Sequence, residues 1–204
     1  MSELLLAPTE ARVLAALVEK SITTPQYYPM TVNALMAASN QKTARQPVMS
    51  LSEGAVGAAL NRLAEDSLVA RDDAGSRVPK WRHRFQHQLL LKPATLAVLA
   101  ILMLRGPQTA AELRANASGL GGPTDADGLK AVLDDLGDRA QPLVRLLPRV
   151  PGQSTPRYAH LLCGEPKAEA TGPAPADPGP SSLQARVSAL EVRVAELEQR
   201  LDAT

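Results

Sequence analysis

The sequence predicts a mainly α fold with small β-hairpins (α+β), built as two tandem winged helix-turn-helix domains followed by a coiled-coil helix. Three observations lead to this prediction. Residues 1–92 follow the order helix, helix, helix and hairpin, and residues 93–163 repeat that order in degenerate form. After a linker at residues 164–181, rich in Pro, Ala and Gly, a heptad repeat fills residues 182–204. Helix-helix-helix-hairpin also occurs in other folds, so the repetition strengthens the prediction.

The first predicted helix begins at Thr9-Glu10, which supplies a capping hydroxyl and an acidic first turn. Apolar residues then recur at helical spacing at Val13, Leu14, Leu17 and Val18. The segment from Ser21 to Pro29 is rich in turn-forming residues and is expected to end this helix.

Thr31 and Ser52 are expected to cap the second and third helices, with a polar connection at 40–51 between them. A strand is predicted from Leu68 to Arg71, and a returning strand from Pro79 to Phe85. Gly75 marks the turn between the two strands, and the hairpin is the predicted first wing.

Matching segments relate residues 93–163 to residues 1–92. AVGAALNRL (55–63) corresponds to GLKAVLDDL (128–136), and PKWRH (79–83) corresponds to PRYAH (156–160). Two degenerate copies of one unit explain these matches, because they occur in chain order. The copies are expected to pack on each other, since a unit of about 75 residues buries only a modest core.

The heptad repeat predicts a parallel two-stranded coil, because valine recurs at a positions and leucine at d positions. The predicted dimerisation residues are Leu183, Val187, Leu190, Val194, Leu197 and Leu201. Arginines at g positions and glutamates at e positions give attractive contacts between two parallel copies. A homodimer is therefore the expected assembly. The alternative is an amphipathic helix that folds back on its own chain, since three heptads are short for an isolated coil.

Composition excludes several classes of protein. The 22 Lys and Arg against 21 Asp and Glu give a net charge of +1, which excludes a strongly basic nucleic-acid coat. One cysteine excludes a disulfide scaffold, and five aromatic residues disfavour base stacking on an aromatic platform. The N-terminus has no signal-peptide pattern, and the most apolar stretch, 94–104, is too short for a bilayer span of about 20 residues. A cytoplasmic protein without a membrane partner is expected.

The basic residues of the first predicted wing indicate a nucleic-acid partner. Six basic residues against two acidic ones give residues 68–92 a local charge of +4. A helix-turn-helix places its recognition helix in the major groove of double-stranded DNA, where nearby cations neutralise phosphates. The predicted DNA contacts lie in the connection, the third helix and the wing; they are Gln41, Lys42, Arg45, Asn61, Arg62, Arg77, Lys80, Arg82 and Arg84.

Two features favour the alternative of a protein-interaction scaffold without DNA binding. The exposed face predicted for the third helix is mostly Gly and Ala, and Glu53 stands where base-reading side chains are expected. The corresponding helix of the second copy, within 124–139, carries five aspartates against Lys130 and Arg139, a charge that repels phosphate. The second copy is expected to serve packing or a protein partner.

No enzymatic activity, cofactor or metal is expected. The sequence has no nucleophile elbow, phosphate loop or paired-cysteine site. His83, His87, His160 and Cys163 suggest only a loose metal set. His83 and His160 occupy equivalent places in the two copies, which favours a structural role in each wing.

Several strings resemble the YceH-like family of uncharacterised bacterial proteins: TTPQYYPMTVNAL (23–35), NQKTARQPVMSLSE (40–53), GSRVPKWRHR (75–84), LRGPQTAAELR (104–114) and RYAHLLCG (157–164). The resemblance covers about residues 4–164 and implies a cytoplasmic bacterial protein with tandem winged helices. It implies no activity and no functional residues. At QKTAR (41–45) the chain has Ala44, where the family usually places Ser-Asn before the arginine.

Overall fold

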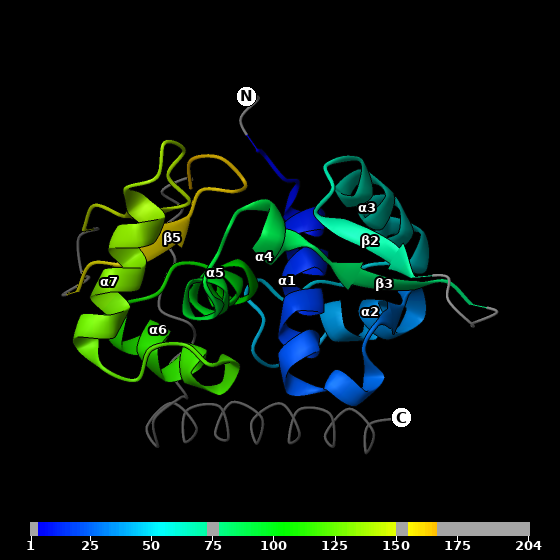
Figure 1. Cartoon of the computed structure of the whole chain (residues 1–204), viewed down its shortest axis with the longest axis horizontal. Coiled ribbons are helices and arrows are strands. Elements are labelled where there is room, and N and C mark those ends of the chain that lie inside the picture. The colour runs from blue at the N-terminus through cyan, green and yellow to red at the C-terminus, as the bar shows by residue number, and fades with distance from the viewer. Residues whose placement is uncertain (1–3, 73–77, 150–154, 167–204) are drawn as a thin grey trace, which may run out of the picture. The chain divides into compact units, whose positions relative to one another are not determined.

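The computed structural model describes residues 4–72, 78–149 and 155–166 (Figure 1). This part of the chain combines helices with two small antiparallel sheets, which confirms the predicted α+β class. The predicted coil (182–204), nearly all of the predicted linker (164–181) and Arg77 lie outside the described residues. We call residues 4–92 the first half and residues 93–166 the second half.

The first half contains three helices, a three-stranded sheet and two short helical turns. In chain order its elements are α1 (Pro8–Thr23), η1 (Pro25–Tyr27), β1 (Met30–Thr31), α2 (Val32–Ser39), α3 (Glu53–Glu65), β2 (Val69–Asp72), β3 (Lys80–His83) and α4 (Phe85–Gln88). The strand order is β1-β3-β2, with β3 antiparallel to both neighbours.

Helix α1 begins two residues before the predicted start, because Ala7 rather than Thr9 is the cap position, and it extends past the predicted end. Pro8 occupies the first turn, where its missing N–H costs nothing, and the carboxylate of Glu10 accepts the Ala7 N–H at 2.7 Å. Thr9 is therefore inside the helix rather than its cap. The helix continues through Ser21 to Thr23, and the Ser21 and Thr23 hydroxyls bond back to carbonyls of the preceding turn.

The predicted caps of α2 and α3 are confirmed. Thr31 Oγ1 accepts the Ala34 N–H and Ser52 Oγ accepts the Ala55 N–H, so each hydroxyl satisfies one unpaired donor of its helix. The returning strand is shorter than predicted. It ends at His83, and Phe85, fully buried in the core, begins α4 instead of ending β3.

The second half repeats the element order of the first. Its elements are α5 (Pro93–Arg105), α6 (Ala110–Ala117), η2 (Ser118–Leu120), α7 (Ala126–Gly137), β4 (Val144–Leu146) and β5 (Tyr158–His160). Helix α7 lies within the predicted range 124–139 and begins after Asp125, whose carboxylate caps it by accepting the Gly128 N–H.

The two halves correspond in local details as well as in the order of their elements. In the first half Met30 pairs with Trp81, and the next residue, Thr31, caps α2. In the second half Gln108 pairs with Tyr158, and the next residue, Thr109, caps α6. Both capped helices have eight residues. This correspondence supports the internal repeat inferred from the sequence.

Helices α1 and α5 pack against each other at the centre, with α2 and α3 on one side and α6 and α7 on the other (Figure 1). Residues 11–18 of α1 and 95–104 of α5 are buried without interruption, as expected for helices covered on all sides. One hydrophobic core joins the two halves. A boundary at residue 92 stays a prediction, because residues 1–166 group as one compact unit. None of the described helices has the length and apolarity needed to cross a bilayer.

Candidate nucleic-acid interface

The residues predicted to contact DNA fall on three neighbouring segments of the first half, which we call the candidate interface: the loop 40–52, helix α3 and the β2–β3 hairpin. The β2–β3 hairpin packs beside α3, and α2 packs against α3 (Figure 1). The second half lies on the other side of α1, away from the hairpin (Figure 1).

The loop 40–52 is closed at its two ends by one amide side chain. Asn40 Nδ2 donates to the Leu51 carbonyl at 2.8 Å, and Asn40 Oδ1 accepts the Leu51 N–H at 2.7 Å. This pairing copies the hydrogen bonds of an antiparallel strand pair and holds the ends of the loop together. Asn40 thus has a structural role next to the predicted contact Gln41.

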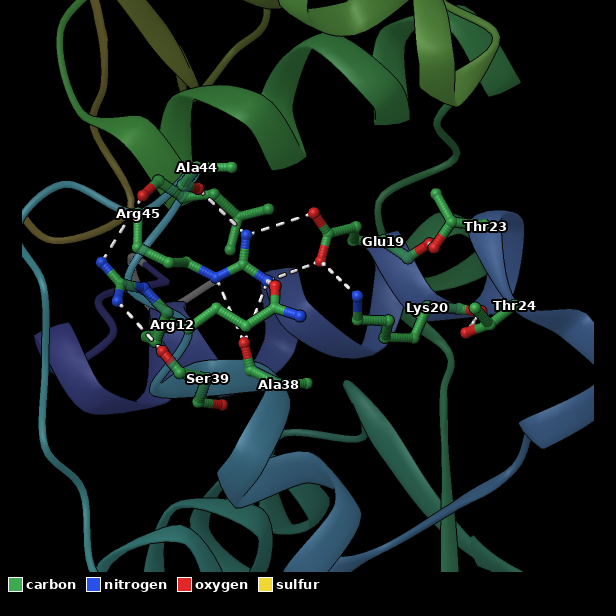
Figure 2. Close-up of polar contacts among 11 residues, drawn as sticks. Arg12, Glu19, Lys20, Thr23, Thr24, Ala38, Ser39, Ala44 and Arg45 are labelled. Atoms are coloured by element: carbon green, nitrogen blue, oxygen red, sulfur yellow. Dashed lines mark hydrogen bonds and ion pairs between the residues drawn. The ribbon is translucent and has the colours of Figure 1, made fainter.

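Arg45 is the central polar residue of the loop, and the structure corrects its predicted role (Figure 2). Its side chain is fully buried, and its guanidinium forms a bidentate pair with Glu19 of α1 at 3.1 and 2.5 Å. It also donates to the Ala38 carbonyl and to Gln41 Oε1 at 2.8 Å. Because these acceptors use the whole fork, Arg45 is not available to a phosphate, and the prediction of a DNA contact there is wrong.

Gln41 is drawn into the same cluster. Its side-chain oxygen accepts from Arg45, whereas its amide nitrogen has no hydrogen bond to a described residue. The adjacent Lys42 is exposed and has no ion pair with any described residue. The cluster therefore fixes the loop backbone at Arg45 and leaves the Lys42 ammonium in solvent.

A second buried arginine, Arg12, lies beside Arg45 (Figure 2) and was missed in the sequence. It is 1% exposed, and the acceptors that it reaches among the described residues are all carbonyls: Ser39 at 3.3 Å, Pro47 at 2.7 Å and Leu104 at 3.5 Å. Burial lowers its pKa, and the charge of Arg45 lowers it further. A charged residue inside the apolar run ARVLAALV was the available signal for this site.

Helix α3 presents an exposed face that is mostly small. Gly54 and Gly57 have no atom within 4 Å of where a Cβ would lie, so no packing inside the described chain requires glycine there. Asn61 and Arg62 are exposed further along the helix, and Arg62 forms a surface ion pair with Glu65 at 2.7 Å. Such exposed pairs contribute little, so Arg62 can exchange Glu65 for another anion.

The hairpin divides its side chains between core and solvent. Trp81 and Val69 face the core, and Arg82 forms an ion pair with Asp72 on the solvent side. Lys80 and Arg84 have no ion pair with any residue in the described ranges. Of the nine predicted contacts, Lys42, Asn61 and Arg84 are thus exposed and Lys80 is partly exposed, each without an ion pair to a described residue, whereas the exposed Arg62 and Arg82 are paired.

The second half has the opposite charge on its corresponding helix. Asp125, Asp127, Asp134, Asp135 and Asp138 of α7 and its ends are all exposed. Lys130 and Arg139 pair with Asp134 and Asp135, which leaves an excess of negative charge on this surface. The expectation that the second copy does not share the phosphate-binding character of the first is consistent with this surface.

Ser21 and His83 lie 3.1 Å apart, measured from Oγ to Nε2. Ser21 Oγ donates to the Val18 carbonyl at 2.7 Å, and His83 Nδ1 is buried without a hydrogen-bond partner. A catalytic base needs a third group to orient it, and no acceptor occupies that position within the described residues. Those residues also contain no group of three or more His, Cys, Asp and Glu that would hold a metal ion.

Comparison with known proteins places this chain in a family. A family described as "Protein of unknown function, DUF480" matches residues 6–153. A UPF0502 protein of Burkholderia vietnamiensis is 52% identical over 160 residues, 78% of this chain and 67% of the relative. A UPF0502 protein of Burkholderia orbicola is 48% identical over 186 residues, which cover 88% of this chain and 78% of the relative. A UPF0502 protein of Azoarcus sp. is 49% identical over 166 residues, which cover 81% of this chain and 74% of the relative. The chain belongs to the DUF480/UPF0502 family of bacterial proteins, in agreement with the YceH-like resemblance of its sequence.

Proposed function

We propose that this protein binds double-stranded DNA through its first half and acts as a cytoplasmic, non-enzymatic protein of the transcription-regulator type. In this proposal the first half is a winged helix-turn-helix, with α3 as the recognition helix and the β2–β3 hairpin as the wing. The second half is a degenerate winged helix that serves as support. The observation that carries the proposal is a group of cations on and beside the loop and hairpin that flank α3: Lys42 and Arg84, which are exposed, and Lys80, which is partly exposed. None of the three forms an ion pair with a residue that the structure describes.

These cations are suited to phosphate groups rather than to bases. Exposed Lys and Arg that bind phosphates release counterions, and this gives binding without strong sequence preference. Base reading falls to Asn61 and the amide nitrogen of Gln41, because the remaining exposed residues of α3 near its start are small or acidic. The proposal therefore predicts a large electrostatic contribution to affinity and a modest contribution from sequence.

The first experiment is fluorescence anisotropy of the full-length protein with pooled genomic duplexes, titrated with salt. Three phosphate contacts per chain predict a log-log slope of about −3 or steeper, with submicromolar binding at low salt. Absence of binding at about 50 mM salt, where electrostatic attraction is weakly screened, would contradict the DNA proposal.

The second candidate function is a protein-interaction scaffold. Glycine inside a helix costs roughly 1 kcal/mol relative to alanine, yet Gly54 and Gly57 have no packing reason inside the described chain. A partner that approaches the α3 backbone closely would explain both positions. If the protein binds no duplex, the next experiment is a search for protein partners of the full-length chain. The variant Gly54→Leu/Gly57→Leu is its negative control.

We also propose that residues 182–204 form a parallel homodimeric coil, which would place two copies of the interface on one duplex. Sedimentation of the full-length chain against a chain truncated after Glu165 tests this proposal. The number of chains per particle should fall from two to one on truncation, and Leu190→Glu/Leu197→Glu should have the same effect in the full chain. An unchanged number of chains per particle would leave the folded-back helix as the explanation.

A further inference from the structure

A backbone hydrogen bond joins the loop 40–52 of the candidate interface to the second half at the Leu104 carbonyl. Leu104 lies in the last turn of α5, where carbonyls have no partner inside the helix. Its oxygen accepts the Gln46 N–H of the loop 40–52 at 2.8 Å and a longer bond from Arg12 Nη2 at 3.5 Å. Two residues later, a Cβ on Gly106 would lie 3.7 Å from the Gln46 carbonyl. The end of α5 therefore touches the middle of the loop.

Arg12 connects the same three parts of the chain. Its guanidinium donates to Ser39 at the end of α2, to Pro47 in the loop and to Leu104 at the end of α5. None of these acceptors is a carboxylate. The negative ends of two helix dipoles, those of α2 and α5, instead stabilise the buried cation. Arg12 is thus a shared cap of two helices from different halves, and the loop crosses it at Pro47.

These contacts are the ones that set the middle of the loop. Asn40 closes the loop ends, while Arg45 is fixed by Glu19, Gln46 by Leu104 and Pro47 by Arg12. The Lys42 side chain is exposed and has no hydrogen bond or ion pair to a described residue, so its position follows from the backbone that these residues hold.

We infer that the second half positions the candidate DNA contacts of the first, with Arg12 and the Leu104 carbonyl as the groups that fix the loop 40–52. The consequence of this inference for DNA binding rests on the proposed function. The coupling between α5 and the loop does not depend on that function. Arg12 is a positioning residue in this inference and does not touch the ligand.

Hydrogen exchange of the full-length protein tests the coupling without DNA. Arg12→Lys keeps the charge but loses the fork that reaches three carbonyls. The Gln46 amide should exchange about tenfold faster or more, because its bond to Leu104 is weakened. The matched control is Arg139→Met, which removes another guanidinium that joins the halves, through the Leu89 carbonyl at 2.6 Å, without touching the loop. Exchange at Gln46 should stay within about twofold of the parent in this control.

A second variant acts from the other side of the contact. Gly106→Ala strains the end of α5, because its φ of 70° disfavours a side chain, and it places a methyl group in contact with the Gln46 carbonyl of the loop. Gly121→Ala adds a methyl group at φ of 77° in open space, away from the loop. Faster exchange at Gln46 in Gly106→Ala alone supports the inference. The inference is overturned if Gln46 exchange is unchanged in Arg12→Lys and Gly106→Ala, or if the controls Arg139→Met and Gly121→Ala accelerate it equally. A Gln46 amide that is unprotected in the parent also overturns it.

The DNA consequence is tested by a double-mutant cycle on duplex affinity. Lys42→Ala should weaken binding about threefold in the parent and less than about 1.5-fold in the Arg12→Lys background, because the loop is then no longer fixed. Equal factors in both backgrounds contradict positioning. If the parent binds no duplex, the proposed function fails, and the exchange measurements still decide the coupling.

Discussion

His83 and His160 occupy the same position in the two hairpins. His83 pairs across its hairpin with Val69, and His160 pairs with Val144 in the other. Each has a buried Nδ1 without a hydrogen-bond partner. Burial lowers the pKa of both to about 4, and His87 contributes to the lowering at His83. Both histidines are therefore neutral parts of the folded chain, which agrees with the structural role expected from the repeat.

The two histidines predict that stability falls in mild acid. An unfolded histidine binds its proton near pH 6.5, whereas these two bind theirs near pH 4 when folded. Between those values the unfolded chain binds more protons, so the free energy of unfolding decreases as pH falls from about 6.5 to 4. The loss amounts to at most about 3 kcal/mol per histidine.

Urea unfolding at several pH values measures this loss, and His160→Gln isolates one contribution. Because glutamine does not titrate, the part of the pH dependence between about 6.5 and 4 should decrease by roughly half in the variant. A variant whose stability changes with pH as much as the parent's would show that His160 does not contribute.

Breaking the buried pair between Arg45 and Glu19 should destabilise the chain strongly. Glu19→Gln leaves a fully buried guanidinium without a counter-charge, and Arg45→Met leaves several carbonyls without a donor. We expect each change to lower the free energy of unfolding by about 3 kcal/mol, as measured by chemical denaturation. The double variant should lower it by less than the sum of the two single losses. Arg62→Gln breaks an exposed pair of similar chemistry and serves as the control. Its unfolding curve should match the parent's, and equal losses at both sites would contradict the account.

Ala44 should be replaceable with a gain in stability. Its φ is 59°, in the left-handed region where a Cβ is unfavourable, and its carbonyl accepts from Arg45 at 3.0 Å. Asparagine tolerates this region better than alanine does, so Ala44→Asn should stabilise the chain by about 0.5–1 kcal/mol. Ala37→Asn, on the exposed face of α2, should destabilise it because asparagine is a weaker helix former. Thermal unfolding of both variants checks the sign, and destabilisation by Ala44→Asn would contradict the assigned strain.

The sequence was informative where local chemistry decides the structure. Thr31 and Ser52 cap their helices as predicted, because a hydroxyl at that position satisfies an N–H of the first turn regardless of distant residues. It was less informative at element ends. Phe85 has the character of a strand residue, but its ring is fully buried in the core and the chain turns into α4 there.

The role of Arg45 could not be predicted, because it depends on Glu19, a residue 26 positions away. In sequence, Arg45 lies in a polar connection near Lys42, and both have the character of phosphate ligands. Only the packing of α2 against α1 brings the Arg45 guanidinium to Glu19 and leaves Lys42 in solvent. Long-range pairing of this kind leaves no local pattern.

DNA binding by the first half depends, in this proposal, on cations that include Lys80 and Arg84. Salt-dependent anisotropy tests it by comparing the full-length parent, Lys80→Glu/Arg84→Glu, and Arg114→Glu/Lys130→Glu. The last pair makes the same change in net charge at exposed positions of the second half. The account predicts that Lys80→Glu/Arg84→Glu weakens binding more than about tenfold and reduces the log-log slope by about 2, while the control changes affinity less than about threefold. Equal weakening by both pairs, or no binding by the parent, would contradict it.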